Sequence, residues 1–184
     1  MARLHVYPQL SFIELERYTA LGANLTGMRV DKVFVPETPG HPDRYFKKEW
    51  ALELHGQTQS AQLYFSVRAQ QSSLVFLPVK RLKPAKLATR SGFDLSLAKK
   101  IEGTRIEKIS TLASERVVKI RFTQGLELIL VLIPMQPEAV LYENGVVIAS
   151  TKTRDENSAP FSLPRARELS TKFCSNMLSY TKSC

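Results

Sequence analysis

The chain has 184 residues, of which 43% are hydrophobic, enough for one substantial core and too few for two. It carries 26 Lys and Arg residues against 17 Asp and Glu residues, a formal charge of +9 that favours an anionic partner, nucleic acid above all. No apolar run reaches the roughly 18 residues of a membrane span, and the first ten residues lack the apolar stretch of a secretory signal.

The two cysteines, Cys174 and Cys184, lie close to the C-terminus. This usage predicts a reducing, cytoplasmic environment without a disulfide framework, and it excludes a zinc site with four cysteine ligands. We expect one domain over residues 1–150, followed by a linker and helical tail over 151–184.

The first predicted element is a helix within residues 11–25, where Phe12, Leu15 and Leu25 form an apolar stripe. Ser11 and Glu14 have the spacing of a capping box at its start. The nonamer "LTGMRVDKV" (25–33) then places Gly27 where a helix ends and φ > 0 is needed. The residues after this glycine alternate apolar and polar side chains, which predicts a strand with one buried face.

The same phrase returns as "IEGTRIEKI" (101–109), after a second predicted helix over 91–102 and with Gly103 in the turn position. The similarity continues as "EWALELHG" (49–56) against "ERVVKIRF" (115–122), and as "SAQLYFSVR" against "LELILVLIP". The offset between the copies falls from 76 to 66 positions. About ten extra residues are therefore expected in "PETPGHPDRYFKK" (36–48), whose prolines and glycine predict a loop.

The repeated unit is a helix, a glycine, a strand, a loop and three further strands. It predicts an α+β, mainly β fold, in which two similar helix-plus-antiparallel-strand units form a β-sandwich or flattened barrel with flanking helices. Asn144-Gly145 predicts a final two-residue hairpin turn. The alternative is that short alternating segments coincide by chance.

Three segments together resemble the N-terminal NFACT domain of fibronectin-binding-protein-A-type proteins and their ribosome-quality-control relatives: residues 10–36, 82–109 and 115–122. The resemblance covers roughly residues 10–150. It implies a fold related to the N-terminal domain of formamidopyrimidine-type DNA glycosylases. It also implies action on the large ribosomal subunit, where tRNA is bound and stalled chains are extended without a template.

The resemblance places the family's tRNA-contacting Asp-Arg pair on Glu115 and Arg116. A carboxylate beside an arginine can orient the guanidinium toward phosphate, although both charges could simply be exposed at a strand start. The sequence departs from the family at "IPMQPEAVLY", where a Gly-Arg-His-Ser-Asn run is usual. The tail beyond residue 150 matches either the first helix of the family's helical module or the stub of a longer protein.

The densest charge lies in residues 80–100, with Asp94 as the single acid. A loop and the helix after it would form a phosphate-binding patch, to which the amide end of the helix could add. The alternative is a solvated face. The basic residues are Lys80, Arg81, Lys83, Lys86, Arg90, Lys99 and Lys100.

Nothing in the sequence supplies a catalytic pair. His5, His41 and His55 lack metal-ligand spacing, and the phosphate-loop and nucleophile-elbow motifs are missing. We therefore expect a non-enzymatic protein without cofactor, metal, membrane or small-molecule substrate, whose partner is RNA, namely tRNA or the large ribosomal subunit. The alternatives are a DNA-binding or DNA-glycosylase-like domain without the usual catalytic N-terminus, and a surface adhesin.

Overall fold

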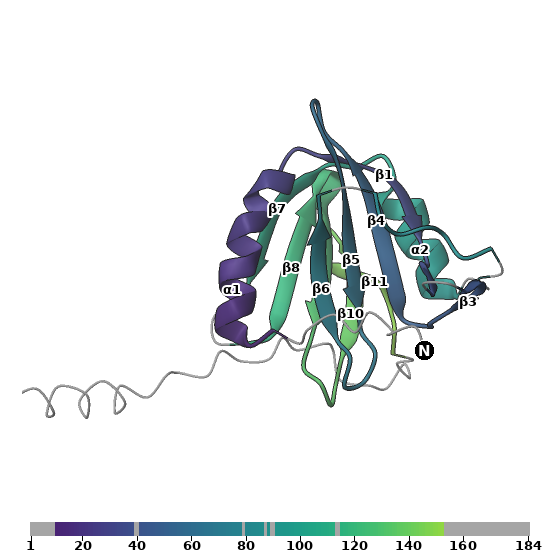
Figure 1. Cartoon of the computed structure of the whole chain (residues 1–184). Helices are drawn as coiled ribbons and strands as arrows, with labels where there is room; N and C mark the ends of the chain where they lie inside the picture. Colours follow the sequence, from purple (N-terminus) through teal and green to yellow (C-terminus); the bar gives the residue numbers. More distant parts are fainter. Residues whose placement is uncertain are drawn as a thin grey trace, which may run out of the picture.

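The computed structural model describes residues 10–38, 41–78, 80–86, 88, 91–112 and 115–152 (Figure 1). No helix within these ranges is long and apolar enough to cross a membrane. The expected tail over 151–184 lies outside them beyond residue 152. The elements are α1 (Phe12–Leu21), a 3-10 turn (Gly22–Leu25), β1 (Arg29–Phe34), β2 (Glu37–Thr38), β3 (His41–Tyr45), β4 (Glu49–His55), β5 (Ser60–Ser66), β6 (Ser73–Leu77), α2 (Gly92–Ile101), β7 (Ile106–Thr111), β8 (Val117–Phe122), a second 3-10 turn (Thr123–Gly125), β9 (Leu126–Val131), β10 (Glu138–Glu143) and β11 (Val146–Ser150).

Nine of the eleven described strands, all except β2 and β3 of a separate small sheet, form two antiparallel sheets that face each other as a sandwich. One sheet has the order β1-β4-β5-β6 and the other has the order β11-β10-β9-β8-β7. Each sheet is therefore a meander that follows one helix, which confirms the predicted mainly β fold built from two similar units. The inward faces share one apolar core, whose fully buried members include Phe65, Phe122, Leu52 and Leu128.

The two copies of the repeated phrase bind each other. The Gly27 amide donates to the Ile106 carbonyl at 2.7 Å, and the Gly103 amide donates to the Val30 carbonyl at 2.7 Å. Two further backbone hydrogen bonds are related in the same way: the Ile106 amide donates to the Met28 carbonyl, and the Val30 amide donates to the Thr104 carbonyl. Equivalent residues differ by 76 positions, so a local two-fold axis passes between them, where Arg29 bridges Arg105. The two copies of the phrase thus pair with each other, each providing the same donors and acceptors.

Both copies also contain a β-bulge at the same place. The register of β1 on β4 shifts between Val30 and Lys32, and that of β7 on β8 shifts between Ile106 and Lys108. The acid of the phrase, Asp31 or Glu107, is the extra residue at each bulge. The strict alternation predicted for these strands was therefore wrong, because Val30 and Val33, three residues apart, are both buried.

The strand register corrects the alignment of the two units. Val30 pairs with Leu54 while Ile106 pairs with Phe122, so β4 and β8 are related by 68 positions and not by 66. In the same way Leu54 pairs with Ala61 and Phe122 with Leu126, which relates β5 to β9 by 65 positions. The second unit is therefore eight residues shorter than the first between its first two long strands. The tighter 3-10 turn before β9 makes it three residues shorter again.

The insertion at 36–48 is more than a loop, because it contains the short antiparallel hairpin of β2 and β3. The predicted turn at Asn144-Gly145 is confirmed. Both residues have positive φ, 51° and 81°, and they connect β10 to β11.

Each helix packs on the first strand of the other unit. α1 contacts β7, and its Tyr18 ring stacks on Phe76 of β6 with the centroids 4.6 Å apart. α2 contacts β1 and β11 on the other side of the sandwich (Figure 1). Both predicted helices begin at capping boxes, Ser11 with Glu14 and Ser91 with Asp94. The helices thus cover opposite flanks of the sandwich.

Replacement of Gly103 by Ala should destabilise the protein by about 1 kcal/mol, because an L side chain is strained in this region of φ. Gly103 has φ +86°, and a Cβ there would meet no atom within 4 Å, so the cost is one of backbone conformation. The change in the free energy of unfolding is measured by urea denaturation. Gly92→Ala is the matched control, since Gly92 starts α2 in open space without positive φ, and it should be neutral or slightly stabilising. Equal losses in both variants would contradict the explanation.

Candidate nucleic-acid interface

The predicted basic segment is fixed to the sandwich by a buried glutamine. The Gln62 side chain, on β5, accepts from the amides of Arg81 and Leu82 at 2.8 Å and donates to the Leu82 carbonyl at 2.9 Å. Further along, the Lys83 carbonyl accepts from Glu37, and Ala85 donates to Val35. Sequence reasoning missed Gln62, whose only signal is an amide within an otherwise apolar strand. The segment is thus a rigid support for its charges.

The side chains of this segment divide into paired and unpaired cations. Arg81, Lys83 and Lys86 are exposed and form no ion pair with the described residues. Lys80 is also exposed, but its Nζ lies 3.1 Å from Glu53 on β4. Three of the predicted residues therefore remain available for an anion.

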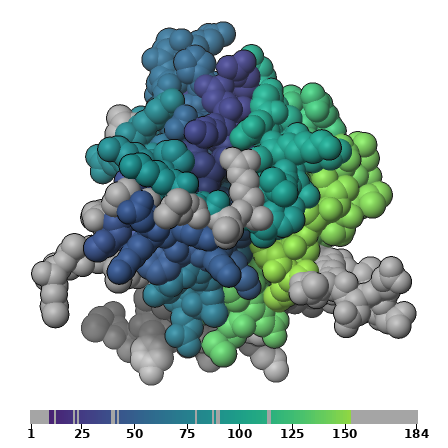
Figure 2. Space-filling view, turned by 90° about the vertical axis from the view of Figure 1, so that its right-hand side faces the viewer, coloured from purple at the N-terminus to yellow at the C-terminus, as the bar shows by residue number. Residues whose placement is uncertain are grey.

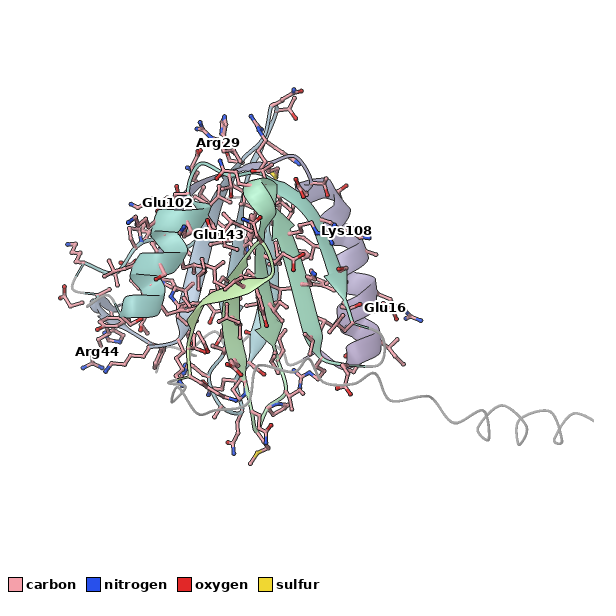
Figure 3. All side chains as sticks on the ribbon, turned by 180° about the vertical axis from the view of Figure 1, so that it is seen from behind. Glu16, Arg29, Arg44, Glu102, Lys108 and Glu143 are labelled. Carbon is pink, nitrogen blue, oxygen red and sulfur yellow. The ribbon has the colours of Figure 1, made fainter. Side chains whose placement is uncertain are left out.

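Of the two lysines of α2, Lys99 is exposed and unpaired among the described residues, whereas Lys100 is paired. Lys100 Nζ lies 2.8 Å from the Glu143 carboxylate on β10, which holds the helix to the second sheet. Figure 3 shows Glu143 beside the helix and Glu102 at its C-terminal end, where Glu102 accepts from the Val33 amide at 2.8 Å. Arg90 lies outside the described residues.

Two adjoining hollows lie between α2, β1, residues 84–86 with Ala88, and the turn before β4. Their volumes are about 480 and 300 Å³, and both are lined by Val35, Trp50 and Asp94. We call the pair the α2 groove. Figure 2 shows this side of the molecule, where the purple atoms of β1 lie between teal atoms on either side, with blue atoms below.

Four lysines line the α2 groove, and none forms an ion pair with the described residues. Lys47 and Lys48 line the larger hollow, while Lys32 and Lys86 line the smaller one. Only Lys86 was predicted from the sequence. Lys32 belongs to the repeated phrase and the other two to the insertion, so only the fold brings them together.

The turn that carries Lys47 and Lys48 is clamped from β5. The guanidinium of Arg68, just beyond that strand, lies 2.8 Å from Glu49 and 4.0 Å from the centroid of the Phe46 ring. The Lys48 carbonyl accepts from Val67 at 3.0 Å, and Lys48 itself has φ +66°. Burial raises the pKa of Glu49, although hydrogen bonds from Arg68 and Tyr64 oppose the shift.

Arg116 lies in the turn before β8 and is half-buried rather than fully exposed. Its Nε is buried without a hydrogen-bond partner among the described residues, and burial lowers the pKa of the guanidinium. Glu115 forms no ion pair with it there. The Leu132 amide donates to the Arg116 carbonyl at 2.7 Å, as Val67 does to Lys48. By the register of the sheets, Arg116 and Lys48 are equivalent positions of the two units.

The predicted site residues thus form two groups. Glu115 and Arg116 lie just before β8, a strand of the sheet whose edge strand β7 contacts α1. Residues 80–86 instead run from Gln62 on β5 to Val35 and Glu37, just beyond β1, the strand that α2 contacts. Within the described residues, no cluster of three His, Cys, Asp or Glu side chains could hold a metal ion.

No family model matches the chain, and no curated protein matches it in sequence. Solved structures do match. The N-terminal domain of the fibronectin-binding protein PavA from Streptococcus pneumoniae superposes with a TM-score of 0.70 at 17% identity, over 91% of this chain and 71% of that one. The fold is that of the N-terminal domains of fibronectin-binding proteins.

Two further structures agree. The N-terminal part of the fibronectin/fibrinogen-binding protein from Streptococcus suis gives a TM-score of 0.63 at 20% identity over 82% of this chain. The fibrinogen-binding protein from Staphylococcus aureus gives 0.57 at 20% identity over 80%. The chain spans 56% of the length of each of these two. At such identities the likeness shows the fold alone.

Glu49→Gln should change how stability depends on pH. The folded state holds the Glu49 proton more tightly than the unfolded chain, whose value is near 4.5, so this stabilisation is present below that pH. It is lost as the pH rises through the raised folded pKa. Gln cannot titrate, so Tm measured from pH 4 to 8 should fall less with rising pH in the variant than in the natural chain. Parallel curves would contradict the assignment.

Proposed function

We propose that the chain is a non-enzymatic, cytoplasmic RNA-binding module of the NFACT type, which contacts tRNA or the large ribosomal subunit. The observation that carries the proposal is the set of unpaired lysines in the α2 groove, continued by Arg81 and Lys83 on the adjoining segment. Cations on a rigid support can replace the counterions of a phosphate backbone without reorganisation. The formal charge of +9 and the sequence resemblance support the same class of partner.

The names of the structural neighbours favour a different partner, fibronectin or fibrinogen. A DNA-binding or glycosylase-like role is the other alternative. RNA is preferred because the sequence resemblance implies it and because the unpaired cations gather along one groove and segment. Binding to a nucleic acid and binding to fibronectin are also expected to differ in their response to salt, because only the nucleic acid releases condensed counterions.

Replacement of Arg81, Lys83 and Lys86 together by Ala should weaken tRNA binding and flatten its dependence on salt. The slope of log K against log salt should fall by up to about three units, because each lost phosphate contact removes about one. Fluorescence anisotropy of labelled tRNA over a series of salt concentrations measures both quantities.

The matched control is the triple variant of Lys80, Lys100 and Lys119. It removes the same charge, but these lysines already pair with Glu53, Glu143 and Glu127. Its salt slope should change much less. Equal effects of both triple variants would mean that binding depends on net charge and not on these particular residues. Salt-insensitive binding to fibronectin, with no binding to tRNA, would support the partner that the neighbours' names suggest.

Arg116→Met tests the position that the resemblance assigns to tRNA contact. Met keeps the apolar stem but removes a charge whose buried Nε has no described partner, so Tm should stay the same or rise. Loss of a charge-assisted phosphate contact should cost about 1–3 kcal/mol of tRNA binding. Unfolding of the variant would make Arg116 structural, and unchanged binding would remove it from the interface.

A further inference from the structure

We propose that the larger hollow of the α2 groove is a pocket for one unpaired nucleotide of the bound RNA, with its phosphate on Lys47 and Lys48 and its base edge at Asp94. This inference rests on the proposed function and names the part of the RNA that the groove takes. The volume of about 480 Å³ falls within the range of small-ligand pockets and suits a single nucleotide, whereas a duplex is too wide to enter it.

The charges in the pocket are separated and fixed. Lys47 and Lys48 come from the turn before β4, which the Arg68 contacts to Glu49 and Phe46 hold in place. Asp94 comes from α2. It is not paired with either lysine in the described structure, so the lining of the pocket offers two cations and a separate carboxylate. A ligand that is anionic at one end and a hydrogen-bond donor at the other matches this arrangement.

Asp94 is held so that it cannot swing toward the lysines. Its Oδ1 accepts from Trp50 Nε1 at 2.5 Å, and its Oδ2 accepts from the Ser91 amide at 2.5 Å. Each carboxylate oxygen has a second lone pair, which can accept from a ligand. Because this carboxylate already occupies the start of α2, a phosphate is better placed at the lysines than at the helix end. An exocyclic amine of adenine or cytosine is a suitable donor to Asp94.

Two of the aromatic side chains that line the larger hollow, Trp50 and Phe93, form walls rather than stacking platforms, whereas the third, Tyr45, is half-buried. Trp50 is 2% exposed and Phe93 is 6% exposed, and their rings meet edge to face at 5.1 Å. Selectivity is therefore expected to come from the hydrogen-bonding edge of the base, and less from its stacking surface. The local two-fold axis adds one further point, because Lys48 is the equivalent of Arg116. The first unit thus repeats a cation at the position that the resemblance assigns to tRNA contact.

Trp50 is the single tryptophan of the chain, so its fluorescence reports directly on this pocket. The experiment titrates the full chain with AMP, CMP, UMP, adenosine and inorganic phosphate. We expect AMP and CMP to change the emission saturably, and adenosine to bind about tenfold more weakly for lack of the phosphate contact. CMP should bind more tightly than UMP, because uracil has a carbonyl where cytosine has its amine.

Substitutions in the pocket test which side chains the nucleotides contact. Lys47→Ala with Lys48→Ala should weaken AMP about tenfold or more, and Asp94→Asn should reduce the preference for CMP over UMP. Lys99→Ala, an exposed lysine on the same helix outside the pocket, is the control and should change neither. The Asp94→Asn variant is first checked by Tm, because it also alters the helix cap. If it does not fold, the lysine pair alone decides.

Several outcomes would overturn the pocket: no emission change with any nucleotide, the same affinity for AMP in the lysine double variant, or a change produced equally by inorganic phosphate. If tRNA binding stays salt-sensitive in any of these cases, the proposed function stands and only the nucleotide pocket is wrong. If nucleotides bind as expected and tRNA does not, the pocket stands as a free-nucleotide site and the proposed RNA function is wrong.

Discussion

The reciprocal pairing of residues 27–30 with residues 103–106 is the constraint on which the rest of the structure depends. It joins the first strand of one sheet to the first strand of the other through backbone hydrogen bonds around a local two-fold axis. The pairing requires Gly27 and Gly103 to leave the preceding helices with positive φ. Because each strand is bound at its start to its counterpart, each helix reaches the neighbouring unit and covers a flank that would otherwise expose a strand edge.

The candidate site arises where the two units differ. The first unit carries the β2–β3 hairpin and the turn with Lys47 and Lys48, while the second carries the short β7–β8 turn with Arg116. On the α1 flank, Tyr18 stacks on Phe76 and bonds to the backbone of β6. On the α2 flank, the position equivalent to Tyr18, 76 residues later, is Asp94. Its shorter side chain accepts a hydrogen bond from Trp50, and a hollow remains beside it. A symmetric scaffold thus presents an asymmetric surface, and the insertion decides which flank is open.

Local chemistry explains how much of this was predictable. The helices, the capping box of Ser11 and Glu14, the two turn glycines and the Asn-Gly hairpin follow from interactions between residues a few positions apart, and all were predicted correctly. The capping box of Ser91 and Asp94 was not predicted. The register was not predicted either, because a bulge at Asp31 and a tighter turn at Gln124 shift it without leaving a sequence signal. The site was predictable only in part for the same reason. Whether Lys86 stays free while Lys100 meets Glu143 depends on which strands become neighbours.

The distribution of ion pairs bears on why the groove exists at all. Several cations on the sheets have acidic neighbours: Lys119 and Arg121 both contact Glu127, and Arg29 contacts Asp31. Such exposed pairs add little stability, but they remove like-charge repulsion. The lysines of the α2 groove have no such neighbours, so their mutual repulsion opposes folding. Their clamped turn and the buried Gln62 hold these charges in place despite that cost. An anion bound in the groove would relieve this repulsion, and that is the physical basis of the proposed interface.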